Sequence, residues 1–219
     1  MSVTSPILVR TYDPKECPQL SAINMDEVMR YGGMMISRTP VPPDTRDESV
    51  GEVRALIDEC ASEVLPMLAY KVCYRHIDVT WDGDSPVLPF DSHRSRNLAH
   101  NLEGCTAGVM FAATIGVGID RLITRYNHSS PSKALILQAL GAERVEALCD
   151  LFNAQIEEEA VAKGMSLRPR FSPGYGDLPL TVQKDFMTLL DCAHLIGINL
   201  NESLLMSPSK SVTAIIGMK

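Results

Sequence analysis

A long helix predicted from Pro131 to about Lys163 and Gly164 sets the main constraint on the fold. Pro131 suits the first turn of a helix, and Gly164 suits the position just after its end. Apolar residues within this stretch can face a core: Leu137, Leu140, Leu148, Leu151, Phe152 and Ile156. We therefore expect one side of this helix to line the core of the protein.

The elements around this helix are mixed. Strands are predicted at 6–12, 70–81, 105–116 and 211–219, with turns at 39–47 and 82–86. Shorter helices are predicted at 23–33, 95–104, 119–127 and 181–197. This order is not a regular alternation of strand and helix, and it shows no internal repeat or linker. The sequence therefore predicts an α+β fold with one domain over residues 1–219.

One further helix is predicted between Ser49 and Pro66. Ser49 and Glu52 form a possible capping box at its start, and Pro66 marks its end. Its apolar stripe repeats at helical spacing: Val50, Val53, Ile57, Cys60 and Val64.

Composition excludes several classes of partner. The net charge of −7 argues against a nucleic-acid partner, because phosphate binding requires a basic surface. No apolar run is long enough to span a bilayer, and no basic segment precedes the short apolar patch near the N-terminus. We therefore expect a cytoplasmic protein with no membrane partner. The six cysteines are far apart without a C-x-x-C pair, which indicates reduced, mostly buried thiols.

The usual catalytic patterns do not occur. The sequence has no G-x-S-x-G and no H-E-x-x-H, and the glycine pattern that binds dinucleotides is broken at Arg121. The segment "DSHRSR" begins like the D-x-H-x-x-G signature of cobalamin-binding modules, but Arg96 stands at the glycine position. We interpret Asp91 and His93 as a helix-start pair. No catalytic residue and no metal site is predicted.

The stretch "RPRFSPGYGDLPL", residues 168–180, has the composition of a rigid binding loop. Its three prolines reduce the entropy lost on ordering, and Gly174 and Gly176 permit close backbone approach to a ligand. Arg170 can hold a carboxylate in a bidentate fork, and Tyr175 offers a flat face. On composition alone, a rigid structural turn with an exposed arginine is the favoured alternative.

Four segments resemble one known family, the activation domain of cobalamin-dependent methionine synthase. The motif R-x-x-P-G-Y at residues 170–175 resembles the R-P-A-P-G-Y loop of that family. "LNESLLMSPSKSVTAIIG" is similar to its L-T-E-S-x-x-M-x-P-x-x-S-V segment, and "MFAATIGVGID" and "ALGAERVEALCD" resemble its central strand and long helix. The order agrees from about residue 105 to the end. The chain is identified as a short, free-standing member.

The resemblance implies a mainly antiparallel, twisted sheet flanked by helices, and a function. Such a domain binds S-adenosylmethionine and docks onto the cobalamin-binding module of methionine synthase, here in trans. An electron donor such as flavodoxin or ferredoxin reduces cob(II)alamin, and the reduced cobalt takes the methyl group of S-adenosylmethionine. Cobalt is then the nucleophile, so the protein needs no catalytic residue of its own. The alternatives are a non-catalytic docking or chaperone module for a corrinoid protein, and an unrelated methyltransferase.

The resemblance also implies the residues that bind S-adenosylmethionine: Arg170, Ser172, Pro173, Gly174, Tyr175 and Glu146. Arg170 would hold the carboxylate, Ser172 would act mainly through its backbone, and Glu146 would face the cationic end. For Glu146 the alternative is a solvated helix face, shared with Glu143, Asp150, Asn153 and Glu157. Gly176 replaces a proline of the family. The acidic residue near the N-terminus of the family domain is not identified, and its tyrosine pair after the last strand has no counterpart before Lys219.

Overall fold

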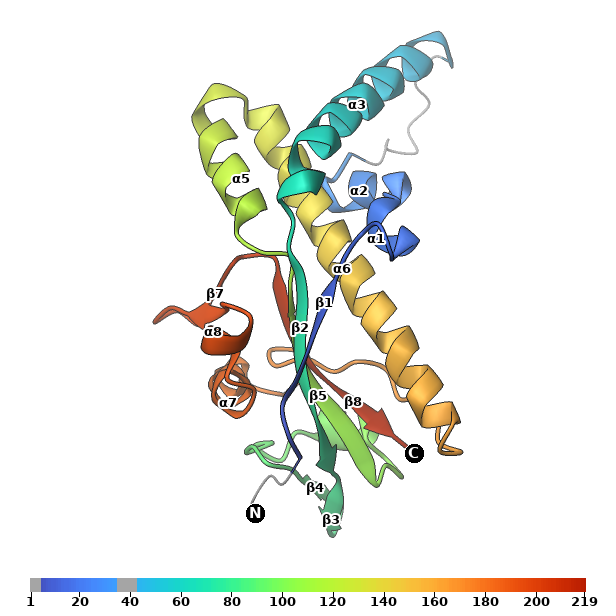
Figure 1. Cartoon of the computed structure of the whole chain (residues 1–219), viewed down its shortest axis with the longest axis vertical. Helices are drawn as coiled ribbons and strands as arrows, with labels where there is room; N and C mark the ends of the chain where they lie inside the picture. Colours follow the sequence, from blue (N-terminus) through green and yellow to red (C-terminus); the bar gives the residue numbers. More distant parts are fainter. Residues whose placement is uncertain (1–4, 35–42) are drawn as a thin grey trace.

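A computed structural model describes residues 5–34 and 43–219, with side chains from residue 51 onward in the second range (Figure 1). The strands are β1 (Leu8–Tyr12), β2 (Tyr70–Asp78), β3 (Thr80–Asp82), β4 (Ser85–Val87), β5 (Ala107–Thr114), β6 (Asn199–Leu200), β7 (Met206–Ser207) and β8 (Ser211–Met218). The α-helices are α1 (Pro18–Ser21), α2 (Met25–Tyr31), α3 (Pro43–Val64), α4 (Arg96–Asn101), α5 (Gly118–Ser129), α6 (Pro131–Val161), α7 (Gln183–Leu189) and α8 (Cys192–Leu195). Two short 3₁₀ helices cover Leu65–Met67 and Leu180–Val182.

The main sheet has four strands in the order β1-β2-β5-β8, and every neighbouring pair is antiparallel. The predicted α+β fold, with an antiparallel sheet flanked by helices, is confirmed. Two smaller two-stranded sheets, β3-β4 and β6-β7, lie outside it. The central strands β2 and β5 are buried along most of their length, which explains their continuous apolar sequences.

Both faces of the main sheet carry a hydrophobic core, because alternate side chains of each strand point to opposite faces. Tyr74 and Phe111 belong to the core under α3, α5 and α6. Their neighbours Cys73 and Met110 belong to the second core, which α4, α7 and α8 cover. Figure 1 shows the long helix α6 lying diagonally across one face and α7 and α8 on the other side.

The long helix is confirmed as α6. Five of its six predicted core residues are fully buried, and Leu151 is partly buried. Gly164 follows the helix with a φ of +71°, the left-handed conformation expected of a glycine after a helix end.

The predicted capping box at Ser49 and Glu52 is wrong. Helix α3 already begins at Pro43, so Ser49 lies inside it. The predicted turn at 39–47 is therefore wrong from Pro43 onward, and its earlier residues lie outside the described residues. Proline suits the start of a helix, because the N–H groups there have no intrahelical partner. The predicted apolar stripe is confirmed at Ile57, Cys60 and Val64, which are buried. The Val50 side chain lies outside the described side chains.

The predicted helix at 181–197 is divided into a 3₁₀ turn, α7 and α8. Asp191 interrupts it with a φ of +47°, a left-handed conformation that aspartate tolerates better than most residues.

The predicted strand at 70–81 is likewise divided at Val79 into β2 and β3. The hairpin β3-β4 takes the place of the simple turn predicted at 82–86. Five of the six cysteines are buried. Within the described residues, no helix has the length and apolar character needed to cross a membrane.

Candidate functional site

The loop at 168–180 is fastened to the outer edge of the main sheet. Strand β8 ends the sheet order, and the chain from Leu167 to Phe171 runs beside it with two isolated bridges, Leu167 to Met218 and Phe171 to Ile215. The backbone groups of Phe171 and Ile215 exchange two hydrogen bonds of 2.9 Å, and the Arg168 N–H donates to Gly217 O at 2.9 Å. The first part of the loop therefore has the fixed geometry of a short added strand.

Helix α4 holds the same loop from a second side. The Asp177 carboxylate accepts hydrogen bonds from the Ser95 hydroxyl and from the backbone N–H groups of Arg96 and Asn97. These hydrogen bonds, first the one from Ser95, lower the pKa of Asp177 below its usual value. The Arg168 Nε donates to the Asn101 carbonyl at 2.7 Å.

The tip of the loop is a tight turn that presents Tyr175. Gly174 has a φ of +87°, and its N–H donates to Leu178 O at 2.9 Å. The Tyr175 N–H donates to Ser172 O at 3.1 Å, while Pro173 is buried below the turn. Tyr175 is 68% exposed, and the Phe171 ring packs edge-on against its ring with the two centroids 5.4 Å apart. The turn thus presents the Tyr175 ring to solvent, where a ligand can reach it.

Arg170 reaches from this loop to helix α6. Its Nη2 lies 2.8 Å from a carboxylate oxygen of Asp150 and 3.2 Å from one of Glu146. The side chains of Arg170, Glu146 and Asp150 are 24%, 42% and 72% exposed. The Nη1 of Arg170 is buried and has no hydrogen-bond partner within the described part of the chain. The structure thus brings together Arg170 and Glu146, two of the residues predicted from the sequence, and leaves the guanidinium incompletely paired.

The polar stripe of α6 is not one solvated face. Asp150 and Glu157 are exposed, Glu146 is partly buried, and Glu143 is buried.

Burial raises the pKa of the neighbouring Cys149 thiol to about 12, and the positive charge of Arg170 lowers it by a smaller amount. Cys149 is therefore a protonated core thiol at neutral pH and offers no nucleophile.

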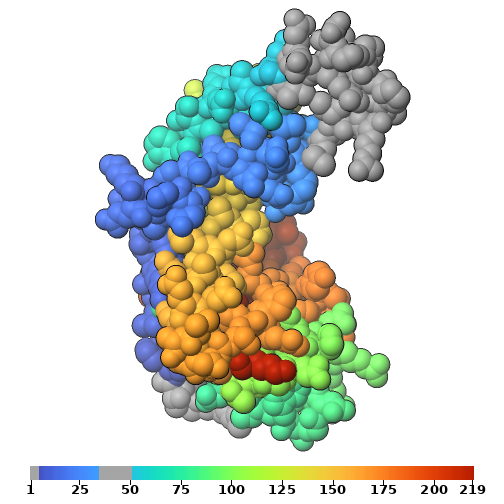
Figure 2. Space-filling model, turned by 90° about the vertical axis from the view of Figure 1, so that its right-hand side faces the viewer, coloured from blue at the N-terminus to red at the C-terminus, as the bar shows by residue number. Residues whose placement is uncertain are grey.

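Two clefts of opposite charge flank the Arg170 ion pair. A cleft of about 600 Å³ lies between α4 and the loop and is lined by Arg168, Arg170 and Tyr175 among others. A cleft of about 570 Å³ lies between α2 and α6, and its wall includes Glu146 and Asp150. Figure 2 views the face on which the blue N-terminal segment, the gold α6 and the orange segment after it adjoin. The arrangement can hold a molecule that carries both a negative and a positive group.

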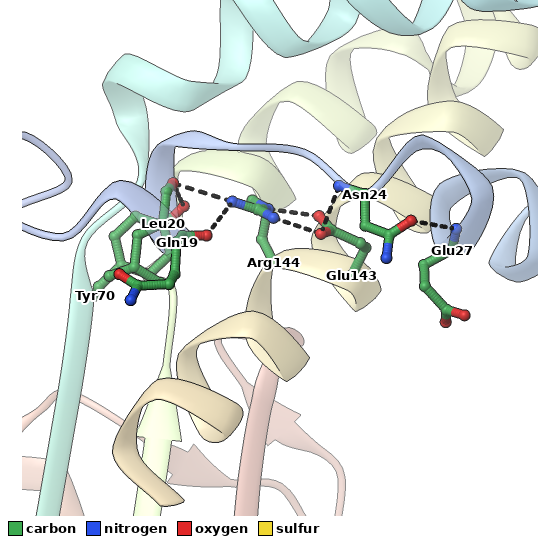
Figure 3. Close-up of polar contacts among 7 residues, drawn as sticks. All are labelled: Gln19, Leu20, Asn24, Glu27, Tyr70, Glu143 and Arg144. Carbon is green, nitrogen blue, oxygen red and sulfur yellow. Dashed lines mark hydrogen bonds and ion pairs between the residues drawn. The ribbon is translucent and has the colours of Figure 1, made fainter. Parts of the chain in front are cut away.

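A second arginine–carboxylate pair joins the N-terminal segment to α6 (Figure 3). Arg144 forms a bidentate pair with Glu143, and their side chains are 1% and 5% exposed. The Nη1 of Arg144 donates to Leu20 O at 3.0 Å, and the Asn24 N–H donates to Glu143 at 3.1 Å. Every charged atom of this pair is compensated, so it fixes α1 and α2 against α6 and builds one wall of the acidic cleft.

Sequence reasoning did not identify Asp150 or Asp177 as members of this site. Helical spacing places Asp150 on the same polar stripe as Glu146, but the family resemblance implies a ligand-binding role for Glu146 alone of the two. Asp177 and its partner Ser95 lie 82 residues apart, and no local pattern links them.

Asp91 and His93 lie before α4, where the His93 N–H donates to Asp91, but Ser95 is the residue that caps the helix. The interpretation of Asp91 and His93 as a helix-start pair is therefore only partly right.

Comparisons with known proteins agree with this architecture. No curated protein matches the chain. Among solved structures, the chain is similar to the MetH reactivation domain bound to AdoHcy, with a TM-score of 0.66 and 15% identity, covering 97% of this chain and 78% of that one. A likeness at this identity shows the fold. A family model described as "Vitamin B12 dependent methionine synthase, activation domain" matches residues 100–219, which is more than half of the chain. The chain therefore belongs to the family of vitamin B12 dependent methionine synthase activation domains.

Proposed function

We propose that this protein binds S-adenosylmethionine and supports the reductive methylation of cob(II)alamin on a partner methionine synthase, acting in trans. The observation that carries the proposal is the incompletely paired Arg170, held by a fastened loop beside Glu146 and an exposed Tyr175. Membership of the activation domain family and the similar fold of a reactivation domain bound to AdoHcy support this choice of ligand.

The charges of the site match those of the ligand. S-adenosylmethionine carries a carboxylate, an ammonium and a sulfonium. The Arg170 guanidinium suits the carboxylate, because a planar fork can donate two parallel hydrogen bonds. Glu146 suits the cationic groups, and the Tyr175 ring offers a surface for an apolar or aromatic part. Ser172, Pro173 and Gly174 contribute through the backbone turn that they form.

The protein supplies position in this reaction. Cobalamin, carried by the partner, supplies the nucleophilic cobalt after one electron arrives from a donor such as flavodoxin or ferredoxin. An electron pair of the reduced cobalt would form the new bond to the methyl carbon as the bond between sulfur and methyl breaks. The electron pair of the broken bond would stay on sulfur, and S-adenosylhomocysteine would leave. The residues of this chain need only hold the sulfonium methyl toward the partner and exclude competing orientations.

A binding experiment tests the ligand. We expect S-adenosylmethionine to bind the wild-type protein in a calorimetric titration and Arg170→Ala to bind at least about tenfold more weakly, since a charge-assisted pair is lost. Arg121→Ala is the matched control, because Arg121 is exposed on α5. Equal affinity in wild type and Arg170→Ala would remove the loop from the site.

A turnover experiment tests the role. Methionine synthase that lacks its own activation domain, in the cob(II)alamin form, is incubated with reductant and S-adenosylmethionine. We expect methylation of the cobalt only when this protein is added, and little with Arg170→Ala. Equal rates with and without the protein would contradict reactivation. Partner binding without S-adenosylmethionine binding would instead support a docking or chaperone module.

A further inference from the structure

The Arg170 guanidinium is occupied by the protein itself in the structure. Within the described residues, both hydrogen bonds that this guanidinium donates to acidic side chains come from Nη2, one to Glu146 and one to Asp150. A primary guanidinium nitrogen has two N–H groups, so both donors of Nη2 are taken. A carboxylate that binds Arg170 through two nitrogens must therefore displace one of these acidic side chains from Nη2.

The two acidic side chains differ in how easily they leave. Asp150 is 72% exposed and Glu146 is 42% exposed, so water can replace the contact of Asp150 more completely. The buried Nη1, which has no partner within the described residues, makes the present position of the guanidinium unfavourable by itself. Glu146 and Asp150 lie at i and i+4 on α6, where like charges repel unless a cation lies between them.

We propose that Asp150 is a positioning residue that competes with the ligand carboxylate for Nη2 of Arg170, and so sets the affinity for ligands that carry a carboxylate. This inference rests on the proposed function, because it takes Arg170 as the carboxylate-binding residue. When the ligand binds, Asp150 turns to solvent, Glu146 keeps its place beside the cationic groups, and the carboxylate takes the vacated donor together with another guanidinium N–H.

Two opposing effects decide the sign of an Asp150 substitution. Removal of the Asp150 charge weakens its hydrogen bond with Nη2, because an amide oxygen is a weaker acceptor than a carboxylate, and this favours the ligand carboxylate. It also removes a negative charge that attracts the cationic groups of the same ligand, but that attraction acts at longer range and is screened over about 8 Å at physiological salt. Direct competition therefore outweighs long-range attraction for a ligand that has a carboxylate. For a cation without a carboxylate only the attraction remains.

The test compares Asp150→Asn with wild type by calorimetric titration of three probes. For S-adenosylmethionine and S-adenosylhomocysteine we expect affinity to rise about two- to fivefold, as for the loss of one exposed ion pair. For decarboxylated S-adenosylmethionine we expect unchanged or weaker binding. Glu157→Gln removes the same charge from the same helix at an exposed position and should leave all three affinities unchanged.

The outcomes separate this inference from the proposed function. Weaker or equal binding of S-adenosylmethionine to Asp150→Asn, with normal binding to wild type, overturns the competition and leaves the proposed function standing. A rise for all three probes also overturns it, because the effect would not depend on a carboxylate. If no probe binds wild type, the ligand assignment itself fails and the competition fails with it. A rise confined to the two carboxylate ligands supports Asp150 as the competitor.

Discussion

Helix α6 carries two arginine–carboxylate groups that use the same chemistry in opposite ways. Arg144 and Glu143 are buried, and each finds further partners in the backbone of Leu20 and Asn24. Arg170 reaches the helix from the loop and meets Glu146 and Asp150 at the surface, and its buried Nη1 has no hydrogen-bond partner within the described residues. The group of Arg144 and Glu143, here the closed group, is buried and fully hydrogen-bonded. The group of Arg170, Glu146 and Asp150, here the open group, is incompletely paired and partly exposed to water.

The difference separates structure from binding. A buried pair is costly to break, because the remaining charge stays in a medium that cannot solvate it. A partly exposed pair contributes little stability, because water replaces each partner at a small cost. Arg170 can therefore exchange its acidic partners for a ligand, while Arg144 cannot. Substitutions in each group test this difference.

The largest expected effect is on stability, at the closed group. Arg144→Met leaves Glu143 buried with the Asn24 N–H and should lower the free energy of unfolding by about 3–5 kcal/mol, measured by urea denaturation. A double variant, Glu143→Leu with Arg144→Met, should recover part of this loss, because no buried charge remains. It should not recover all of it, since Leu20 and Asn24 lose their partners. A loss below about 1 kcal/mol in the single variant would contradict the assignment of a structural role.

The second effect is on binding, at the open group. Arg170→Met keeps the aliphatic stem and should change the free energy of unfolding by less than about 1 kcal/mol, because the pair is partly exposed. The same variant should weaken S-adenosylmethionine binding by about 10- to 100-fold, the value of a hydrogen-bonded charge pair. Urea denaturation and calorimetric titration of one preparation give both quantities. A loss of stability as large as that of Arg144→Met would erase the contrast between the two groups.

Helical periodicity was sufficient to predict α6 and its core face, because burial of a helix follows a 3.6-residue repeat. The Arg144–Glu143 pair could not be predicted in this way. Adjacent residues on a helix do not normally face each other, and this pair forms where Leu20 and Asn24 fold over the helix from more than a hundred residues away. At Arg170 the composition of the loop by itself favoured a structural turn. Only the family motif pointed to Arg170 and Glu146, and it did not include Asp150.

The third prediction concerns the sign of two charge removals within the open group. Glu146→Gln should weaken S-adenosylmethionine binding about two- to fivefold, because a partly exposed carboxylate beside the cationic groups is lost. Asp150→Asn, the same change one turn later, should act in the opposite direction. Calorimetric titration of both variants at low and at high salt measures the two changes in affinity. Both changes should be smaller at high salt. Equal signs would show that the two acids are interchangeable around Arg170.

The smallest expected effect concerns the fastening of the loop by Asp177. The folded state lowers the pKa of this carboxyl, chiefly through the hydrogen bond from Ser95, so the ionised form favours folding. This contribution is present above the unfolded pKa of about 3.9 and is lost as the pH falls through the lower folded value. Asp177→Asn should therefore be less stable than wild type at neutral pH, and this difference in the free energy of unfolding should disappear in acid.

Amide hydrogen exchange at Arg96 and Asn97, whose N–H groups donate to this carboxylate, measures locally how firmly the loop is held to α4. Faster exchange in Asp177→Asn at neutral pH, with the Arg170 contacts retained, would show that the loop is held from α4 independently of the open group. A gap that widens in acid would contradict this sign and with it the role of the ionised Asp177.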